Sequence, residues 1–338
     1  AGVAARIRTR LSLRVVVAGG TTAVAPSIGI AAFPDDGEEA GTLLANADLA
    51  MYEAKRRRSG QQICFFNQSI AEAVRQRALL LEQVEQALAE DHFVLHYQPI
   101  VDLPAGNTVA VEALLRWPQP DGSLRAPGTF IPEVERHSRR LTQALGRYVL
   151  TSALAQAAAW QRDGYELAVA VNVSAREFLE DGFLPDLIEL LAEHPDLPRE
   201  RLVLEITETA ALEDLPRARA VMQSCCELGV RFALDDFGAG HASLANLREL
   251  PVDRLKIDGA FVAGLPGAAG DRAVVQAILA VAKAFGVDVV AKGVETAAQS
   301  QILQEFGCRL MQGYHFARPM PVGLLSERLD TEQQAQQT

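Results

Sequence analysis

Residues 231–258 read RFALDDFGAGHASLANLRELPVDRLKID. A strand-like run, Arg231–Leu234, leads directly into the acidic pair Asp235-Asp236, and a glycine-containing loop follows. A helix-like segment, Ala242–Leu250, then precedes a second strand-like run, Arg254–Ile257. Two strands that are joined through a helix run parallel in one sheet. The sequence therefore predicts a parallel α/β unit with two carboxylates at the end of its first strand.

The same alternation extends from residue 92 toward the C-terminus. It predicts a (β/α) barrel or a doubly wound sheet. The sequence has neither a glycine fingerprint of the dinucleotide-binding type after the first strand nor a P-loop. The other strand-like runs are Phe93–Ile100, Val109–Trp117, Leu167–Val173, Arg201–Ile206 and Val287–Ala291. The other helix-like runs include Leu141–Gln161, Phe183–Glu193, Leu215–Leu228, Arg272–Phe285 and Thr296–Phe306.

Composition and charge exclude several classes of protein. The chain has 338 residues, of which 49% are hydrophobic and 22% are charged, so it can bury a sizeable core. Its formal net charge of −11 argues against a protein that coats nucleic-acid polymers, because such a protein needs a basic face. No uninterrupted apolar run reaches membrane-spanning length, and the four cysteines lack the spacing of a disulfide scaffold or a zinc site. We therefore expect a cytoplasmic protein with reduced thiols.

Three zones follow one another along the chain. Residues 1–68 hold an amphipathic start, a β-like run at Pro26–Phe33 and a helix at Ala40–Arg58. Residues 69–91 read as one helix, because apolar residues recur there at helical spacing. We expect this helix to connect the first zone to the main domain, which would span residues 92–330.

Polar side chains lie in the strand-like runs of the main domain or just beyond their ends. For any single one, a helix cap is the simpler explanation. The whole set is harder to explain in this way, because a parallel barrel collects the carboxyl ends of its strands on one face and at least four acids would meet there. Oxygen ligands without His or Cys suit Mg²⁺ or Mn²⁺, and two adjacent aspartates can serve two ions. The set is Glu112, Asn172, Glu205, Asp235, Asp236, Lys256 and Gln312.

Several short motifs in a fixed order resemble the EAL domain, a bacterial phosphodiesterase that linearises cyclic di-GMP to pGpG. The resemblance covers roughly residues 75–325 and implies a TIM-like (β/α)8 barrel. Around Glu112-Ala-Leu-Leu-Arg116, the motifs are Tyr97-Gln98-Pro99-Ile100, Asn172-Val173-Ser174, Glu205-Ile206-Thr207-Glu208, Asp235-Asp236-Phe237-Gly238-Ala239-Gly240, Lys256-Ile257-Asp258 and Gln312-Gly313-Tyr314.

The resemblance implies a site with two Mg²⁺ or Mn²⁺ ions. Asp236, with a share of Asp235, would serve the second ion, and Lys256 would face the attacking water or the developing charge. An ammonium among carboxylates stays protonated, which favours electrostatic stabilisation by Lys256 over a role as general base. Glu208 would brace the loop Phe237–Ser243, although a surface cap is the alternative. The ligands of the first ion would be Glu112, Asn172, Glu205 and Asp235.

The nucleotide-binding side of the site is also implied by the resemblance. Arg116 would clamp a phosphate, because its planar guanidinium donates two parallel hydrogen bonds. Gln312 would hold the nucleotide or solvent near the metal ions. The full set of expected ligand-binding residues is Gln98, Leu114, Arg116, Asp236 and Gln312.

One position departs from the family pattern. The family reads Ala-Glu-Gly-Val-Glu where this chain has Ala291-Lys292-Gly293-Val294-Glu295, so Lys292 replaces a carboxylate of the metal and catalytic-water site. A protonated lysine cannot ligate a metal ion. We therefore expect cyclic di-GMP binding with impaired turnover.

Two alternatives to an active phosphodiesterase stay open. The first is a non-hydrolysing cyclic di-GMP receptor, and the second is a barrel enzyme that uses Mg²⁺ on another phosphate or an enolate. Residues 1–68 resemble the C-terminal part of a GGDEF (diguanylate cyclase) domain, on the motifs at residues 27–31 and 47–55. The GGDEF signature would lie before residue 1, so we expect no cyclase activity from this chain. By analogy with the family, we expect a homodimer with upstream sensor and GGDEF segments.

Overall fold

The computed structural model describes residues 2–17, 20–24, 26–56, 62–239 and 244–336. Contacts between residues divide the chain into two compact units, residues 1–83 and 84–338. The division falls within helix α3 (Gln68–Ala89), the segment in which the sequence predicts a connecting helix.

The first unit contains two small sheets. Strands β1 (Leu13–Val17) and β2 (Gly20–Val24) form an antiparallel hairpin, which the sequence did not predict. Strands β3 (Ile28–Ile30) and β4 (Ile63–Phe65) pair in parallel. Helix α1 (Gly2–Leu11) opens the unit, and α2 (Ala40–Arg56) packs closely on β3. The last two residues of the predicted helix 40–58 lie outside the described residues.

The second unit is built around a barrel. Among the described residues, nine strands form one sheet in the order β5-β13-β12-β11-β10-β9-β8-β6-β7, and pairing of β5 with β6 closes eight of them into a barrel. This confirms the predicted barrel and excludes a doubly wound open sheet. The strands are β5 (Val94–Asp102), β6 (Asn107–Pro118), β7 (Leu124–Arg125), β8 (Ala168–Asn172), β9 (Leu202–Thr207), β10 (Arg231–Phe237), β11 (Arg254–Ile257), β12 (Asp288–Ala291) and β13 (Leu310–Met311).

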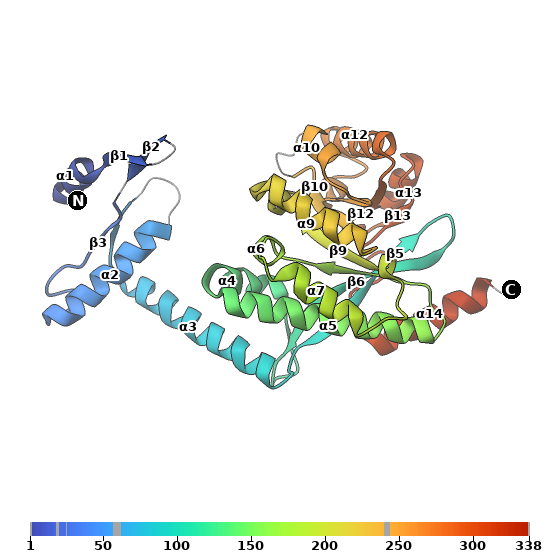
Figure 1. The fold of residues 1–338 in the computed structure, drawn as a ribbon, viewed down its shortest axis with the longest axis horizontal. Helices are drawn as coiled ribbons and strands as arrows, with labels where there is room; N and C mark the ends of the chain where they lie inside the picture. The colour runs from blue at the N-terminus through green and yellow to red at the C-terminus, as the bar shows by residue number, and fades with distance from the viewer. Residues whose placement is uncertain (1, 18–19, 25, 57–61, 240–243, 337–338) are drawn as a thin grey trace. The chain divides into compact units, whose positions relative to one another are not determined.

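Helices surround this barrel, as Figure 1 shows for α5, α7, α9 and α12. Long helices such as α5 and α12 connect parallel strands, which is the connection that such strands require. The helices of the second unit are α4 (Ile131–His137), α5 (Arg139–Arg162), α6 (Ala175–Phe178), α7 (Phe183–Ala192), α8 (Glu208–Glu213), α9 (Leu215–Glu227), α10 (Leu244–Glu249), α11 (Gly259–Ala263), α12 (Ala269–Phe285), α13 (Ala297–Glu305) and α14 (Val322–Gln336), with 3-10 turns at Pro127–Thr129 and Arg199–Arg201.

Alternation along each strand separates two buried layers. Successive side chains of a strand point to opposite faces, so one set fills the barrel and the other packs under the helices. The outer set includes Val171, Leu204 and Leu255, which belong to the large core between strands and helices. The inner core is made mostly of small residues and is composed of Ile100, Ala110, Ala168, Ala170, Val203, Ala233, Val290 and Leu310.

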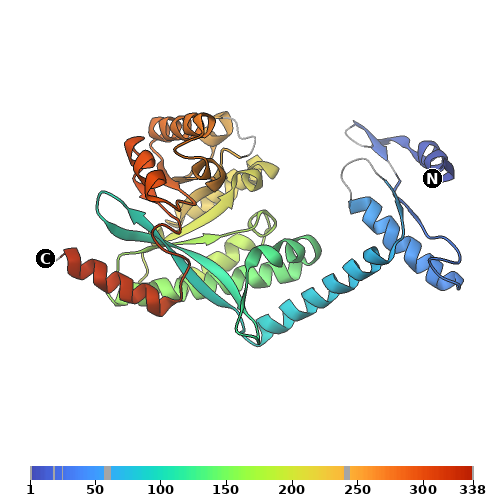
Figure 2. The same cartoon turned by 180° about the vertical axis from the view of Figure 1, so that it is seen from behind.

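Strand β5 corrects the expectation of a wholly parallel barrel, because it runs antiparallel to both neighbours, β6 and β13. The cause is the turn of four residues, 103–106, between β5 and β6, which is too short for the crossover that parallel strands need. This hairpin is the long teal ribbon in Figure 2. Its register places Gln98 directly opposite Glu112.

Two further observations concern the predictions about membrane spans and cysteines. None of the helices formed by the described residues is both long and apolar enough to cross a membrane. The four cysteines, Cys64, Cys225, Cys226 and Cys308, are free thiols.

Candidate active site

The polar residues predicted from the strand ends meet at one end of the barrel, which we call the mouth. Strand register brings them together, because Glu112 and Gln98 pair across β6 and β5, and Asn172 pairs with Glu205 across β8 and β9. Five of these side chains belong to buried residues even though they are polar or charged. Buried polar groups require partners, and most of these partners come from other residues of the mouth. The five are Glu112, Glu205, Asp235, Lys256 and Gln312.

Glu112 accepts hydrogen bonds from three other residues of this cluster. Its Oε2 accepts hydrogen bonds from Lys256 Nζ at 2.8 Å and Gln312 Nε2 at 2.7 Å, and its Oε1 accepts one from Asn172 Nδ2 at 2.8 Å. Burial by itself would raise the pKa of Glu112, but the ammonium of Lys256 and the donated hydrogen bonds outweigh burial and lower it. Glu112 is therefore ionised, and both of its carboxylate oxygens accept hydrogen bonds.

Lys256 is shared between two buried carboxylates. Its Nζ also donates to Glu205, and it lies 4.0 Å from Asp235 Oδ1. Burial lowers the pKa of Lys256, yet the surrounding carboxylates raise it well above its ordinary value. Burial and the charge of Glu112 raise the pKa of Glu205, because one ammonium cannot fully compensate two buried acids. Lys256 is consequently a permanent positive charge inside the mouth.

Lys292 holds the aspartate pair near the end of β10, a strand that extends through Asp235 and Asp236 to Phe237. Its Nζ donates to both oxygens of Asp235 at 2.7 Å and to Asp236 Oδ1 at 2.9 Å. Burial lowers the pKa of Lys292, and the ion pair with Asp235 raises it by more, so that the ammonium form is favoured. The side chain of Asp236 is 50% exposed, whereas that of Asp235 is 8% exposed. The replacement predicted to matter from sequence thus lies in direct contact with two expected metal ligands.

The expected ligand-binding residues line the same mouth. Gln98 Nε2 donates to the carbonyl of Ala317, and Gln98 Oε1 accepts from Gln312 Nε2 at 3.2 Å. Arg116 is half-buried and donates to the carbonyl of Leu115, and it makes no ion pair with any described residue. Leu114 lies between them on β6, with its backbone paired to residue 96. The guanidinium of Arg116 therefore keeps most of its donors available for a ligand.

One buried acceptor in the mouth has no partner. Gln312 uses both hydrogens of its amide, but its Oε1 is buried and makes no hydrogen bond with a described residue. A buried acceptor without a donor is costly, and a bound molecule or water can remove that cost.

The turn after β10 is strained and braced. Asp236 adopts φ = 52°, a left-handed conformation that is uncommon for residues other than glycine, and Gly238 follows with φ = 97°. Glu208 Oε2 accepts a hydrogen bond from the amide of Gly238 at 3.1 Å, and Glu208 is buried. This contact fits the brace that the resemblance implies rather than a surface cap. Residues 240–243 of the predicted loop lie outside the described residues.

Sequence reasoning did not assign a role to Tyr314 or Arg318. The guanidinium of Arg318 lies 4.2 Å from the ring centroid of Tyr314, which is 50% exposed. Burial lowers the pKa of Arg116, and Tyr314 and Glu112 are the side chains whose interactions with its guanidinium act in the opposite direction, so Tyr314 lies near the predicted phosphate clamp. The available signal was the motif Gln312-Gly313-Tyr314, in which an exposed aromatic follows a site residue.

The donor set fits the implied metal ions only in part. Glu112, Asn172, Glu205 and Asp235 carry oxygens of the type that Mg²⁺ and Mn²⁺ prefer, but here the amide nitrogen of Asn172 faces Glu112, and Lys256 lies between the three acids. The second position does not fit, because the Lys292 ammonium lies on Asp235 and Asp236, where the ion would need a carboxylate. Among the described residues, no group of three or more His, Cys, Asp or Glu has the arrangement of a metal centre.

Comparison with known proteins establishes the family. The EAL domain family matches residues 81–319, and the family described as "Diguanylate cyclase, GGDEF domain" matches residues 1–61. The chain belongs to the EAL domain family. Its EAL domain is preceded by part of a GGDEF domain, as the sequence motifs predict.

Curated relatives carry both domains in longer chains. The bifunctional diguanylate cyclase/cyclic di-GMP phosphodiesterase MucR of Pseudomonas aeruginosa is 38% identical over 95% of this chain and 46% of its own length. The cyclic di-GMP phosphodiesterase NbdA of the same organism is 36% identical over 96% of this chain and 41% of its own length. The chain thus spans less than half of the length of these relatives.

Solved EAL structures match the fold of the second unit. The structure titled "PaMucR Phosphodiesterase, c-di-GMP complex" has a TM-score of 0.70 and 38% identity, and it covers 73% of this chain and 99% of that chain. The FimX EAL domain of Pseudomonas aeruginosa bound to c-di-GMP has a TM-score of 0.65 and 26% identity, with 71% of this chain and 96% of that chain covered.

Proposed function

We propose that the mouth binds cyclic di-GMP and that Lys292 slows its hydrolysis to linear pGpG in this chain. The observation that carries the proposal is the contact of the Lys292 ammonium with both oxygens of Asp235 and with Asp236, inside a set of site residues that is otherwise complete. Two similar structures, of MucR and FimX, are titled as complexes with c-di-GMP.

Binding would rest on side chains that keep unused hydrogen-bonding groups. Arg116 has a half-buried guanidinium without an ion pair to a described residue, and a phosphodiester presents oxygens that match its planar donors. Gln312 Oε1 has no donor and would accept one from a base or a ribose hydroxyl. Gln98 keeps Gln312 in place by accepting from its amide nitrogen.

The chemistry depends on how charge is arranged in the mouth. When bound by Glu112, Asn172, Glu205 and Asp235, a divalent ion would supply positive charge to the phosphodiester and lower the pKa of water. Lys256 stays protonated, because three carboxylates surround its ammonium, so it stabilises developing negative charge and does not accept a proton. Glu208 holds the amide of Gly238 and thereby fixes the turn that presents Asp236.

The second candidate function is a cyclic di-GMP receptor that binds without cutting. Lys292 is the observation that favours it, since its ammonium must release three hydrogen bonds before a metal ion can use Asp235 and Asp236 together. The remaining site residues are those of the enzyme rather than of a degenerate site. We therefore place this chain as an impaired phosphodiesterase first and as a receptor second.

The test is to measure binding and turnover on the same preparation. Calorimetry with cyclic di-GMP in the presence of Ca²⁺ reports binding, and chromatography after incubation with Mn²⁺ reports pGpG. We expect clear binding and slow product formation. Binding without any product would favour the receptor, and the absence of binding would refute both functions. We also propose a homodimer, which light scattering on the purified chain will check.

A further inference from the structure

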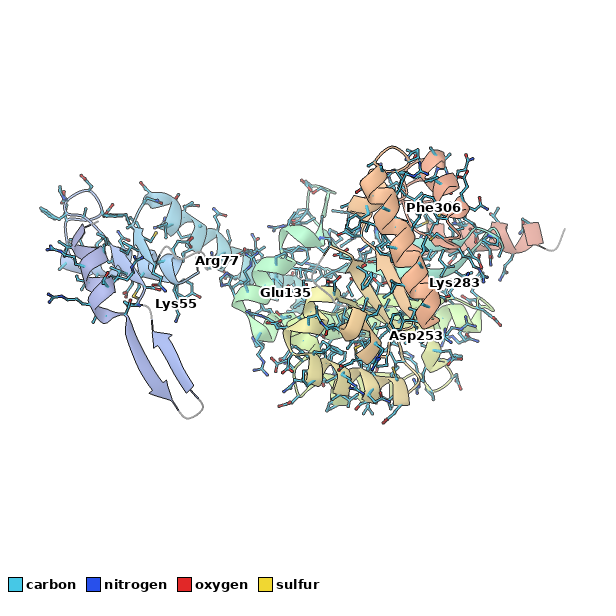
Figure 3. All side chains as sticks on the ribbon, turned by 90° about the horizontal axis from the view of Figure 1, so that it is seen from above. Lys55, Arg77, Glu135, Asp253, Lys283 and Phe306 are labelled. Carbon is cyan, nitrogen blue, oxygen red and sulfur yellow. The ribbon has the colours of Figure 1, made fainter. Side chains whose placement is uncertain are left out.

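A cavity of about 750 Å³ opens at the end of the barrel opposite to the mouth. Arg254 and Asp288 line it as the first residues of β11 and β12, and Asp102 lines it as the last residue of the antiparallel β5. Lys283 of α12 and Phe306, just beyond α13, line the same cavity and are labelled in Figure 3. Its volume is in the range typical of small-molecule sites, roughly 300–1,000 Å³.

Arg254 is the polar group in this cavity that most needs a partner. It lies two residues before Lys256 in β11, so both side chains leave the same face of the strand, toward the barrel interior. The side chain of Arg254 is partly buried but makes no hydrogen bond or ion pair with any described residue. Burial and the charge of Arg231 lower its pKa, although Asp288, Glu205 and Asp253 act in the opposite direction. If Arg254 had a purely structural role here, its guanidinium would be expected to form an ion pair with one of those acids.

The charge balance of the cavity favours an anion. Arg309 donates to both oxygens of Asp102, so these two charges neutralise one another. Lys283 is exposed and has no ion pair with a described residue. Among the acids that line the cavity, this leaves Asp288 beside Arg254 and Lys283, while Glu205 and Asp253 act on Arg254 from outside the lining. The cavity therefore has an excess of positive charge in a chain whose net charge is −11.

The walls of the cavity add an apolar surface next to these cations. Leu279 of α12, Val287 and Phe306 contribute this surface. Two cations without direct partners match the double negative charge of a phosphate monoester better than the single charge of a carboxylate. The apolar walls suit a planar ring attached to the phosphate.

We propose that this cavity is a second ligand site, which binds an organic phosphate of nucleotide size with Arg254 and Lys283 on the phosphate. The site is separate from the mouth, and the proposal does not depend on whether the mouth binds or hydrolyses cyclic di-GMP. Lys283 is exposed on α12, whereas Arg254 is partly buried at the start of β11, so the phosphate would lie between this helix and the start of β11.

Calorimetric titration of the full chain with GMP and with AMP tests this proposal, with cyclic di-GMP present in excess so that the mouth is filled. Lys283→Glu changes an exposed helix residue and is expected to fold normally, and Arg254→Gln removes the second cation. Each change should weaken nucleotide binding by about tenfold or more. Arg116→Ala and Lys55→Glu are the controls, since the first alters the mouth and the second reverses an exposed charge in the other unit.

The arms of the titration separate the possible outcomes. We expect GMP or AMP to bind more tightly than inorganic phosphate or guanosine. Inorganic phosphate can contact only the two cations, and guanosine can contact only the apolar walls. Nucleotide affinity that is lost in Arg116→Ala and kept in Lys283→Glu would place the ligand in the mouth and overturn the proposal. Absence of binding by both nucleotides at millimolar concentration would also overturn it. If Arg254→Gln fails to fold, Lys283→Glu still decides the result.

Discussion

Replacement of Lys292 by glutamate should restore phosphodiesterase turnover. In the present chain the ammonium lies 2.7 Å from both oxygens of Asp235 and 2.9 Å from Asp236. A metal ion on those carboxylates would lie close to this ammonium, and one unit of like charge at about 4 Å already costs about 4 kcal/mol at an effective dielectric of 20. A glutamate removes this repulsion and adds an oxygen ligand. Because every 1.4 kcal/mol or so is a factor of ten in rate, a gain of about 100-fold requires only part of that energy.

The assay is pGpG production by both forms at saturating Mn²⁺ and cyclic di-GMP. Lys292→Met separates the two contributions, since it removes the positive charge without supplying a ligand and should give an intermediate rate. Lys55→Glu is the matched control, because it makes the same charge reversal at an exposed position in the first unit. A fast Lys292 form, or a Lys292→Glu form that is no faster, would refute the assignment of this position to the catalytic metal site.

Three further predictions concern binding and stability. Arg116→Ala should weaken cyclic di-GMP binding by about 1.5–3 kcal/mol, the usual cost of a charge-assisted hydrogen bond, and an unchanged Kd in calorimetry would remove Arg116 from the site. Burial, with the charges of Glu135 and Asp186, raises the pKa of Glu177 to about 8, so the folded protein keeps a proton that the unfolded chain loses above about pH 4.5. Stability should therefore fall as the pH rises from about 4.5 to about 8 and level off above that. Glu177→Gln should flatten this slope and raise the urea midpoint at pH 8; an unaltered slope would contradict the assignment. Gly313→Ala should destabilise by about 1–3 kcal/mol, because the new Cβ would lie 2.0 Å from the carbonyl oxygen of Val294. Gly323→Ala meets nothing within 4 Å and should be neutral or stabilising in the same urea titration.

Local sequence carried most of the information about which side chains form the site. Asp235 and Lys256 could be assigned to strand ends because the strand-like runs Arg231–Leu234 and Arg254–Ile257 contain or lead into them. Glu208 could be linked to the turn after β10 only by resemblance, and its hydrogen bond to Gly238 fits that role. Such predictions work because the carboxyl ends of the parallel strands of a barrel all lie at the mouth, so a residue at a strand end lies there too.

Charge pairing over long separations could not be read from the sequence. The contact between Lys292 and Asp235 joins residues 57 positions apart, and the tie between Lys256 and Glu112 joins residues 144 apart. Sequence places each residue on its strand, but the register between strands decides which ammonium reaches which carboxylate. The antiparallel direction of β5 could not be read from the sequence either, since the alternation of strands and helices alone suggested a parallel strand.

Motifs that are continuous along the chain were sufficient to recognise the family and, through it, the barrel and the polar residues at its mouth, whereas periodicity alone left a doubly wound sheet open. Three facts needed the folded chain: Gln98 lies opposite Glu112, Gln312 Oε1 accepts no hydrogen bond from a described residue, and the Arg254 side chain lines a cavity without a bonded partner among those residues. These facts depend on closure of the barrel. Closure brings residues from distant segments within hydrogen-bond distance, and it sets which of their donors and acceptors are satisfied by the protein.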